Sequence, residues 1–504
     1  MKTRRLQAIS TVLLIGLGGC ESTSFKPDDK PDLQDTGSPQ VDDTATSSTP
    51  PVESAEPKDT STDTAPPDTG EAPPPKPEWA PGKQWVRTHE MMISGLVVQM
   101  DAPSSSTAST YFDTFGANTA HFWQTGLPDE VGAWRASSDA DYQWISWVDG
   151  DGMSSANGVV GGGVGANPDG RVAYQIGDEP RNASDLAALQ TGIDAVRSTD
   201  PDALIIVNFG NAESMTDREA LIETYANSMG GDIISYDQYG YDYNTYEHMA
   251  QVRRVALEHD MPYWRYLRAF SEAGDSGDWP VESDMRWDAF KGLVYGFTGH
   301  TWFLYQADPA HSLETSLFSS TGSWSASRSE WFDIAAQLNF EMINVGETIT
   351  QLTSTDVRYI PSVSLYTPDD TTDWSEGAGD DPYITGIEAI DLSIVEYQDV
   401  LVGFFKDDAG EIYVMLQNPT HESADWPVMV SDEATFRVDF DFSSAPSSLN
   451  SDRLEVLDNT SGTVGSLSLQ TNGGSNRYLE VSLAAGDAIL FKYATASDFV
   501  RRGE

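Results

Sequence analysis

Cysteine is almost absent from this chain, since only one occurs among 504 residues. A single cysteine cannot form an intrachain disulfide, so the folded part must be stable without such cross-links. Basic residues are also few, with 29 Lys and Arg against 79 Asp and Glu and a formal net charge of −50. Proteins bind nucleic acids largely through Lys and Arg that neutralise phosphates, so this charge argues against nucleic acid as a partner.

Metal-binding patterns are missing from the sequence as well. It contains no His-Glu-x-x-His pair, and one cysteine cannot build a thiolate site. The Asp-Gly-Asp-Gly segment at 149–152 resembles the beginning of a calcium loop, but it lacks the later ligands of such a loop and is better explained as a turn. We therefore expect no metal and no cofactor.

The first 20 residues have the pattern of an export signal. Three basic residues lie between positions 2 and 5, and the apolar stretch at 6–17 is too short to span a bilayer. The Leu-Gly-Gly-Cys that ends at Cys20 resembles the lipobox of bacterial lipoproteins. The resemblance implies lipidation of Cys20 and a place in the bacterial cell envelope. Because Glu21 and not Asp comes next, we expect the outer membrane or the cell surface. An ordinary signal peptide with an unrelated cysteine is the alternative.

Residues 21–82 differ in composition from the rest of the chain. They hold 13 of the 27 prolines and 14 acidic against 4 basic residues, with very few large apolar side chains. Such a segment cannot bury a core, so it is predicted to be an extended, disordered tether. Asp35 and Asp68 each begin an Asp-Thr-Gly tripeptide like that of aspartic proteases, but neither has the flanking apolar strands that this chemistry requires.

Residues 83–356 show short apolar runs about 30 residues apart, the length of a strand, a helix and two loops. The expected strands are 93–101, 118–124, 142–149, 172–178, 203–209, 232–238, 262–268 and 300–306. Helical stripes lie between them, as in 186–196, where Asn182 could provide the N-cap. Eight such units predict an α/β fold, a (β/α)8 or TIM barrel. An open doubly wound sheet competes, but its glycine-rich phosphate loop is missing after the first strand.

Residues 357–498 contain shorter and more closely spaced runs. The segments 401–405, 412–416, 436–442, 479–483 and 488–493 alternate or are continuously apolar. This pattern predicts a C-terminal antiparallel β-sandwich domain. We expect the domain to pack against the barrel, with carbohydrate binding as a second possible role.

Acidic residues occur where the barrel strands should end. In a (β/α)8 barrel the active site lies at the carboxyl ends of the strands. The acids expected there are Asp101, Asp149, Asp178, Glu179, Asp237 and Glu272. Aromatic residues accompany them: Trp123, Trp147, Tyr236, Tyr239, Tyr241, Trp264, Trp302 and Tyr305. Such a cleft suits glycoside hydrolysis, because one acid protonates the leaving oxygen, a second attacks or activates water, and flat rings stack on sugars.

The segment 174–180, Tyr-Gln-Ile-Gly-Asp-Glu-Pro, resembles the end of strand 4 in barrel glycosidases of the clan that includes the family 42 β-galactosidases. That strand ends in Asn-Glu-Pro, and here Asp178 replaces the Asn. Segments 234–239, 282–299, 302–305 and 339–343 are similar to related uncharacterised glycosidase-like proteins. The resemblance implies a glycoside hydrolase with Glu179 as acid/base. Retaining members carry a nucleophilic Glu at the end of strand 7, but 263–268 contains no acid, so Asp237 and Glu272 both stay open as its partner.

These patterns together predict a lipid-anchored hydrolase of O-glycosidic bonds in a poly- or oligosaccharide. A neutral glycan fits the negative charge of the chain better than an anionic one. The residues expected to contact it are Asp101, Trp123, Trp147, Asp178, Tyr236, Tyr239, Trp264, Arg268, Trp302 and Tyr305.

Several alternatives stay open. A non-catalytic carbohydrate-binding lipoprotein could retain the barrel. Asp178 and Glu179 could merely pair with Arg181 or Arg268. Arg265 and Arg268 could hold a substrate carboxylate or an internal partner, of which the internal ion pair is favoured. His121 and His300 are better explained as core histidines than as catalysts.

Overall fold

The computed structural model describes residues 79–97, 105–123, 143–148, 163–166, 168–210, 215–240, 244–272, 280–305, 313–318, 328–361, 367–390, 399–422 and 433–503. All of them belong to the second of the two compact units into which the chain divides, residues 75–504.

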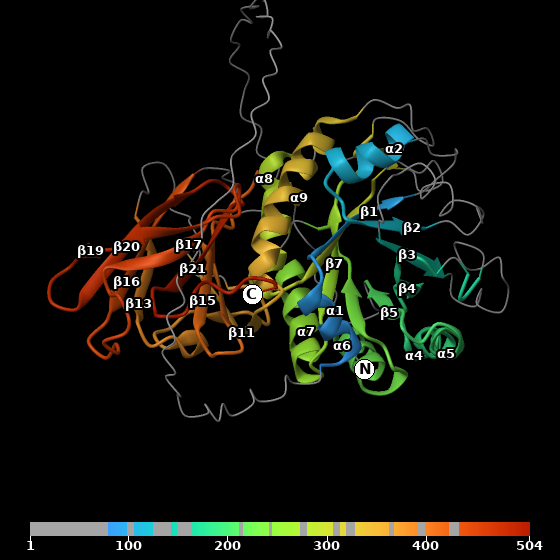
Figure 1. Cartoon of the computed structure of the whole chain (residues 1–504), viewed down its shortest axis with the longest axis horizontal. Coiled ribbons are helices and arrows are strands. Elements are labelled where there is room, and N and C mark those ends of the chain that lie inside the picture. Colours follow the sequence, from blue (N-terminus) through green and yellow to red (C-terminus); the bar gives the residue numbers. More distant parts are fainter. Residues whose placement is uncertain are drawn as a thin grey trace, which may run out of the picture. The chain divides into compact units, whose positions relative to one another are not determined.

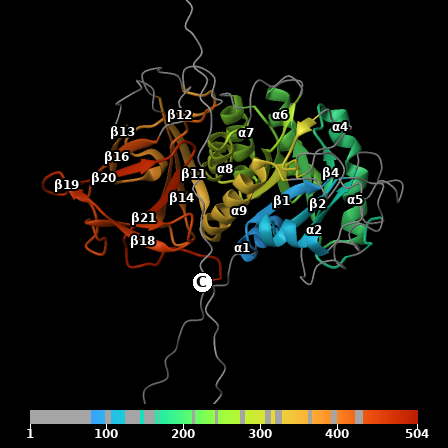
Figure 2. The ribbon, with the colours of Figure 1, turned by 90° about the horizontal axis from the view of Figure 1, so that it is seen from above.

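Eight parallel strands close into a barrel in the order β1-β2-β3-β4-β5-β6-β7-β9 (Figures 1 and 2). Their bounds are β1 Met92–Val97, β2 Thr119–Phe122, β3 Gln143–Val148, β4 Arg171–Asp178, β5 Leu204–Phe209, β6 Ile233–Tyr236, β7 Tyr263–Arg268 and β9 Gly299–Phe303. Each lies within one residue of, or inside, a strand expected from the sequence. The predicted α/β class and TIM barrel are therefore confirmed.

Helix α1 Pro81–Thr88 precedes the first barrel strand. The helices described between and after the barrel strands are α2 Ser105–Ser109, η1 Thr110–Thr114, α4 Ala183–Ala188, α5 Gln190–Thr199, α6 Met215–Thr224, η4 Tyr225–Met229, α7 Asn244–Glu258, α8 Glu282–Tyr295 and α9 Glu330–Ile349. A short 3-10 helix, η6 Ala378–Asp380, lies in the C-terminal region. Asn182 caps α4 as expected, because its side chain accepts hydrogen bonds from the N–H groups of Ser184 and Asp185. No helix in these ranges is both long enough and apolar enough to cross a membrane.

One end of the barrel is filled by apolar side chains. Residues near the amino ends of the strands form a single buried cluster with Val86 of α1: Met92, Ile145, Val172, Leu204, Ile233 and Trp264. The ring of Trp85 in α1 lies 5.5 Å from that of Trp264. Gly82 allows this helix to approach closely, since a Cβ there would lie 2.2 Å from the carbonyl oxygen of Asp232. Helix α1 therefore covers the amino end of the barrel.

Two sheets form the C-terminal region. One has the order β12-β11-β14-β15-β21-β17-β18 and the other β13-β16-β20-β19. Their bounds are β11 Thr353–Ile360, β12 Thr372–Asp373, β13 Ile384–Ala389, β14 Val400–Lys406, β15 Ile412–Gln417, β16 Ala434–Asp441, β17 Arg453–Leu457, β18 Val464–Ser468, β19 Gln470–Thr471, β20 Asn476–Leu483 and β21 Ala488–Tyr493. Residues of both sheets, among them Phe404 and Phe436, share one core. The pairing is antiparallel as predicted, except between β11 and β12.

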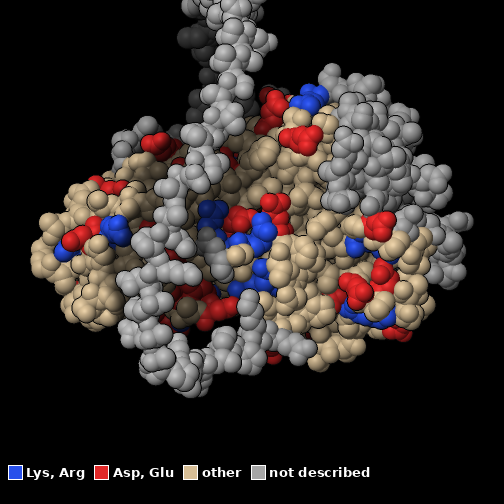
Figure 3. Space-filling view, viewed as in Figure 1, with Lys and Arg blue, Asp and Glu red and all other residues tan. Residues whose placement is uncertain are grey.

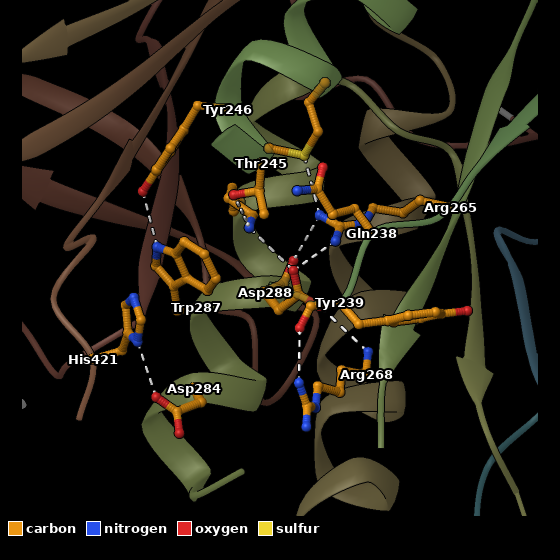
Figure 4. Close-up of polar contacts among 12 residues, drawn as sticks. Gln238, Tyr239, Thr245, Tyr246, Arg265, Arg268, Asp284, Trp287, Asp288 and His421 are labelled. Atoms are coloured by element: carbon orange, nitrogen blue, oxygen red, sulfur yellow. Dashed lines mark hydrogen bonds and ion pairs between the residues drawn. The ribbon is translucent and has the colours of Figure 1, made fainter. Parts of the chain in front are cut away.

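Helices α8 and α9 lie between the barrel strands and these sheets in both views (Figures 1 and 2). The side chain of Gln417 in β15 donates to the carbonyl oxygen of Trp287 in α8 at 3.1 Å. His421 lies 2.9 Å from Asp284 and stacks on the Trp287 ring with centroids 4.2 Å apart (Figure 4). Burial lowers the pKa of His421. Specific polar contacts thus join α8 to the C-terminal sheets.

Candidate active site

Strand β4 ends in an irregularity that places two acids at the barrel end. The register between β4 and β5 shifts between Gln175 and Asp178. Gly177, with φ of 79°, permits this shift, and a Cβ there would lie 2.5 Å from Leu189. Glu179 has a left-handed φ of 41°, a conformation that costs a non-glycine residue about 1–3 kcal/mol. Bulges and strained residues of this kind often re-aim side chains at functional sites.

Glu179 lies in a pocket of about 360 Å³ lined by Trp147, Gly177, Asp178, Glu179, Pro180, Arg181, Asp185, Ala188 and Leu189. Its backbone N–H donates to the carbonyl oxygen of Asn208 in β5 at 2.9 Å. Gly210 leaves room for the carboxylate, since a Cβ there would lie 2.2 Å from Oε1 of Glu179. The carboxylate is half-buried and forms no ion pair with any residue that the structure describes. The alternative of a pair with Arg181 or Arg268 therefore does not hold for Glu179.

Asp237 follows β6, which is two strands from β4 in the barrel. Its N–H donates to the carbonyl oxygen of Phe209 at 3.1 Å, which continues the pairing of β6 with β5. Only 7% of the residue is exposed, and its Oδ1 is buried without a hydrogen-bond partner in the described ranges. Burial raises the pKa of Asp237 well above its ordinary value, and the charges of Asp178 and Glu179 raise it further. Asp237 therefore tends to hold a proton.

Asn208, on the strand between these acids, escaped the sequence-based prediction. It is 1% exposed, and its Nδ2 donates to Oδ1 of Asp178 at 2.9 Å. The hydroxyl of Ser235 in β6 donates to Oδ1 of Asn208 at 2.9 Å. Hydrogen bonds from Tyr239 and Asn208 also favour the charged form of Asp237, which partly opposes the rise of its pKa. One signal was present: Asn208 is the only polar residue of the strand Leu204–Phe209.

Arg218 of α6 supplies a buried cation near the acids, and the sequence analysis did not identify it. It is 2% exposed, and its Nε donates to the carbonyl oxygen of Gly210 at 2.8 Å. Burial lowers the pKa of Arg218, whereas the nearby charges of Asp237 and Glu179 act to raise it. No sequence pattern marks this residue, because it lies on a helix nine residues beyond the end of β5 at Phe209.

Aromatic rings form a continuous row at the same end of the barrel. The ring centroids of Trp147 and Trp123 lie 5.8 Å apart, and those of Trp123 and Phe303 also 5.8 Å. Tyr239 lies 5.2 Å from both Phe303 and Phe270. The structure thus brings together three of the expected aromatic residues and adds two that the sequence analysis missed. We call this set, Trp123, Trp147, Tyr239, Phe270 and Phe303, the aromatic row.

Arg268, at the end of β7, binds the protein's own backbone. Its Nε donates to the carbonyl oxygen of Phe270 at 3.1 Å. Its Nη1 donates to the carbonyl oxygen of Tyr239, also at 3.1 Å (Figure 4). The guanidinium carbon lies 4.6 Å from the centroid of the Phe270 ring. Arg268 thus joins the chain after β6 to the chain after β7 and supports the aromatic row, and its expected contact with substrate stays a prediction.

Arg265 points away from the barrel interior, toward α8. Its Nη2 lies 2.6 Å from Oδ1 of Asp288, and Lys291 lies 3.2 Å from the same oxygen (Figure 4). Burial acts to raise the pKa of Asp288, but Arg265 and Lys291 outweigh it and hold the pKa below its ordinary value. The internal ion pair favoured for Arg265 is present.

Four aromatic residues expected at the site lie elsewhere. Trp264 lies in the apolar cluster at the opposite end of the barrel. Tyr236 packs on His248 of α7, and Trp302 donates from Nε1 to Oδ1 of Asn339 in α9 at 2.7 Å. Tyr305 lies among Tyr111, Phe115, Phe318 and Phe332. The reason is geometric: alternate residues of a strand face the helices, and residues at its amino end are remote from the site.

The remaining candidates are placed in part or not at all. Only the backbone of Glu272 is described, in the short strand β8 Ser271–Glu272, which pairs with β10 Leu313–Thr315 outside the barrel. Asp101, Asp149, Tyr241 and Cys20 lie outside the described residues.

His121 and His300 are buried, and burial lowers the pKa of each to about 3, as suits core histidines. Within the described ranges, His, Cys, Asp and Glu form no group of three that could hold a metal ion.

Comparisons with known proteins give likeness at the level of fold. No protein-family model matches the sequence, and no curated protein matches it. Among solved structures, a glycoside hydrolase family 5 protein from Bacteroides vulgatus shares 10% identity over 82% of this chain and 91% of its own, with a TM-score of 0.47. A family 30 subfamily 8 xylanase from Clostridium acetobutylicum shares 11% identity over 81% of this chain and 97% of its own, with a TM-score of 0.37.

A mannanase catalytic domain from a Streptomyces species shares 16% identity over 48% of this chain and 82% of its own, with a TM-score of 0.34. These structural neighbours are glycoside hydrolases, but TM-scores below 0.5 carry no argument about activity.

Proposed function

We propose that the chain is a glycoside hydrolase that uses Glu179 and Asp237 as its pair of carboxylates. One observation carries the proposal: the two acids follow β4 and β6, the two strands that flank β5, at one end of the barrel, and the environment of Asp237 favours its protonated form. In such sites the surroundings give the two acids different pKa values, and this difference separates the role of acid from the role of base. The aromatic row beside them offers flat rings for stacking on sugars.

The raised pKa of Asp237 indicates how the roles divide. Asp237 donates it to the leaving glycosidic oxygen, while the carboxylate of Glu179 attacks the anomeric carbon or activates a water. This assignment reverses the role that the resemblance to the family 42 clan implies for Glu179. A separation of about 5 Å between the two carboxyl groups would give retention of configuration, and about 6.5–9.5 Å would give inversion.

A comparison of leaving groups tests this division. Asp237→Asn should keep turnover of a dinitrophenyl glycoside, whose leaving group needs no proton, and lose turnover of the corresponding alkyl glycoside. Glu179→Gln should lose both. The opposite pattern, with Glu179→Gln active on the dinitrophenyl glycoside alone, would assign the acid role to Glu179 instead.

The substrate class follows from charge and from the aromatic row. A net charge of −50 repels strongly anionic polysaccharides. Figure 3 shows Lys and Arg side chains next to Asp and Glu on the described part of one face, without a separate basic patch there. We propose a neutral poly- or oligosaccharide. A screen of neutral and anionic glycans for release of reducing ends tests this: binding without release by the wild-type protein would instead support a non-catalytic carbohydrate-binding protein.

The proposal includes the envelope location inferred from the sequence. The Leu-Gly-Gly-Cys ending at Cys20 supports lipidation there, and the composition of 21–82 supports a flexible connection to the barrel. Mass spectrometry of the protein purified from membranes tests it. A Cys20→Ala protein that stays in the membrane fraction would contradict lipid anchoring.

Gly210→Ala should lower kcat by about a hundredfold, because the new Cβ occupies the position of the Glu179 carboxylate and small displacements of a catalytic group have effects of this size. Gly386→Ala is the matched control, since its Cβ would meet only Asp439 at an ordinary 3.7 Å. Steady-state kinetics with thermal unfolding of both variants measure the effect. Unchanged kcat in Gly210→Ala would remove Glu179 from the catalytic pair.

A further inference from the structure

Three polar side chains meet inside the barrel: His121 of β2, Gln175 of β4 and Tyr266 of β7. The Tyr266 hydroxyl donates to Oε1 of Gln175 at 2.7 Å and lies 3.5 Å from Nδ1 of His121. None of the three residues is more than 2% exposed. The interior of such a barrel is usually filled by bulky branched side chains, so a buried polar cluster there calls for an explanation.

The cluster lies next to the pocket of Glu179. Trp147 lines that pocket, and its ring centroid lies 6.0 Å from that of His121. Trp147 also pairs with Gln175 in the register of β3 and β4, so the two side chains point to the same face of the sheet. Because Gln175 contacts Tyr266 three strands away, that face is the barrel interior. The polar cluster and the wall of the pocket are therefore adjacent.

Two atoms of the cluster, Nε2 of His121 and Nε2 of Gln175, are buried without a hydrogen-bond partner in the part of the chain that the structure describes. Their roles follow from Tyr266, because a phenol has a single O–H. That O–H goes to Gln175, so the phenol oxygen can only accept from His121, which places the imidazole proton on Nδ1. Nε2 of His121 is then an acceptor, and the Gln175 amide is a donor.

Reversal of the Gln175 amide leaves this balance unchanged. Tyr266 would then accept from Gln175 and donate to His121, and the amide oxygen and the N–H at Nε2 of His121 would lack partners. Either assignment leaves one donor and one acceptor. Burial lowers the pKa of His121 to about 3, so the imidazole is neutral near pH 7. A hydroxyl group, which both donates and accepts, matches this uncharged pair, whereas a carboxylate only accepts and an ammonium group only donates.

We propose that His121 and Gln175 form a subsite that binds hydroxyl groups of a neutral sugar and thereby selects which sugar the protein accepts. Tyr266 is the positioning residue that holds both side chains. The inference rests on the proposed function for its place in a reaction, but binding itself needs no turnover. A buried polar group without a partner is costly, so a sugar that lacks the matching hydroxyl should bind less tightly.

Titration of the full chain with D-glucose, D-galactose, D-mannose and D-xylose tests the inference. The readout is the imidazole ¹⁵N resonance of Nε2 in His121, which His121→Phe identifies. We expect one of these sugars to move the resonance in a saturable way. The deoxy analogue that lacks the bound hydroxyl should bind about tenfold less tightly, because a hydrogen bond to a buried group is lost. A resonance that none of the four sugars moves would mean that the pair holds an ordered water only, and the inference would be wrong.

Gln175→Met separates this subsite from other contacts of the sugar. The substitution keeps the length of the side chain but removes the amide, so the sugar should lose about tenfold in affinity and its deoxy analogue nothing further. His300→Phe is the matched control. Both ring nitrogens of His300 are also buried without a partner in the described ranges, but a Cβ at Gly292 of α8 would lie 2.7 Å from its Nε2, so the ring faces that helix. His300→Phe should leave both affinities unchanged.

The outcomes distinguish this inference from the proposed function. Equal affinities of the wild-type protein for the sugar and each of its deoxy analogues would overturn the subsite, whether or not the variants fold. Hydrolysis with an unchanged KM in folded Gln175→Met would overturn the subsite but keep the hydrolase. A sugar bound through His121 and Gln175 by a protein that hydrolyses no glycoside would support the subsite and reject the hydrolase.

Discussion

Glu179→Gln is expected to lower kcat on any glycoside by about a thousandfold or more. The substitution keeps the size of the side chain and its place beside Gly210 but removes the charge that attacks or activates water, and groups that act in this way contribute up to about 10⁴-fold. Because the carboxylate forms no ion pair with the described residues, folding should be unaffected. Steady-state kinetics together with urea unfolding of the same preparation measure both quantities.

Glu388→Gln, an exposed residue of β13, is the matched control and should change neither quantity. A folded Glu179→Gln protein with wild-type turnover would remove the basis of the proposed mechanism. A variant that fails to unfold cooperatively would instead show that the residue is structural.

Asp288→Ala should reduce the free energy of unfolding by about 3–5 kcal/mol. Asp288 is 3% exposed and faces Arg265 at 2.6 Å and Lys291 at 3.2 Å, and removal of one partner from a buried network leaves charges without compensation. Oδ2 of Asp288 also accepts the backbone N–H of Arg268, with N and O 3.4 Å apart. Because Arg268 supports the aromatic row, turnover should fall as well. Urea unfolding at neutral pH measures the loss.

The pH dependence of this loss has a definite sign. The pKa of Asp288 is lowered in the folded protein, so its contribution is fully present above the unfolded value of about 4 and is lost as the pH falls through the folded value. The difference from the wild type should therefore be constant from pH 5 to 8 and shrink only in stronger acid. Glu219→Ala, which breaks the exposed pair with Arg254, should cost no more than about 0.5 kcal/mol; an equal loss in both variants would contradict the argument.

The barrel could be predicted from the sequence because its determinants are local. Eight apolar runs recur at a regular interval, and strands of this length must be buried on both faces in a parallel barrel. The same reasoning places acids at strand ends, which is why Glu179 and Asp237 both lie at the carboxyl end of the barrel. It does not show at which end of the barrel a side chain lies or to which face of its strand it points. Trp264 was therefore expected at the wrong end and Trp302 on the wrong face.

The missing site residues depend on contacts between segments distant in sequence. Asn208 donates to Asp178 on the neighbouring strand, and Arg218 reaches the site from a helix. Phe270 and Phe303 join the aromatic row only because the chain after β7 meets the end of β9. Gly210 matters because it has no Cβ, which leaves room for the Glu179 carboxylate. None of these contacts produces a periodic pattern in the sequence. They can be identified only once the strands are paired in their register.

The covering of the barrel by α1 has a consequence for how the protein would face its surroundings. This helix is the first described element after the proline-rich segment, and it lies at the amino ends of the strands, whereas Glu179 and Asp237 lie at the carboxyl ends. The chain therefore enters the barrel on the side opposite the acids. The segment that would carry a lipid at Cys20 is thus joined to the barrel at the end opposite the candidate acids, and a glycan that binds at the acids need not approach that junction.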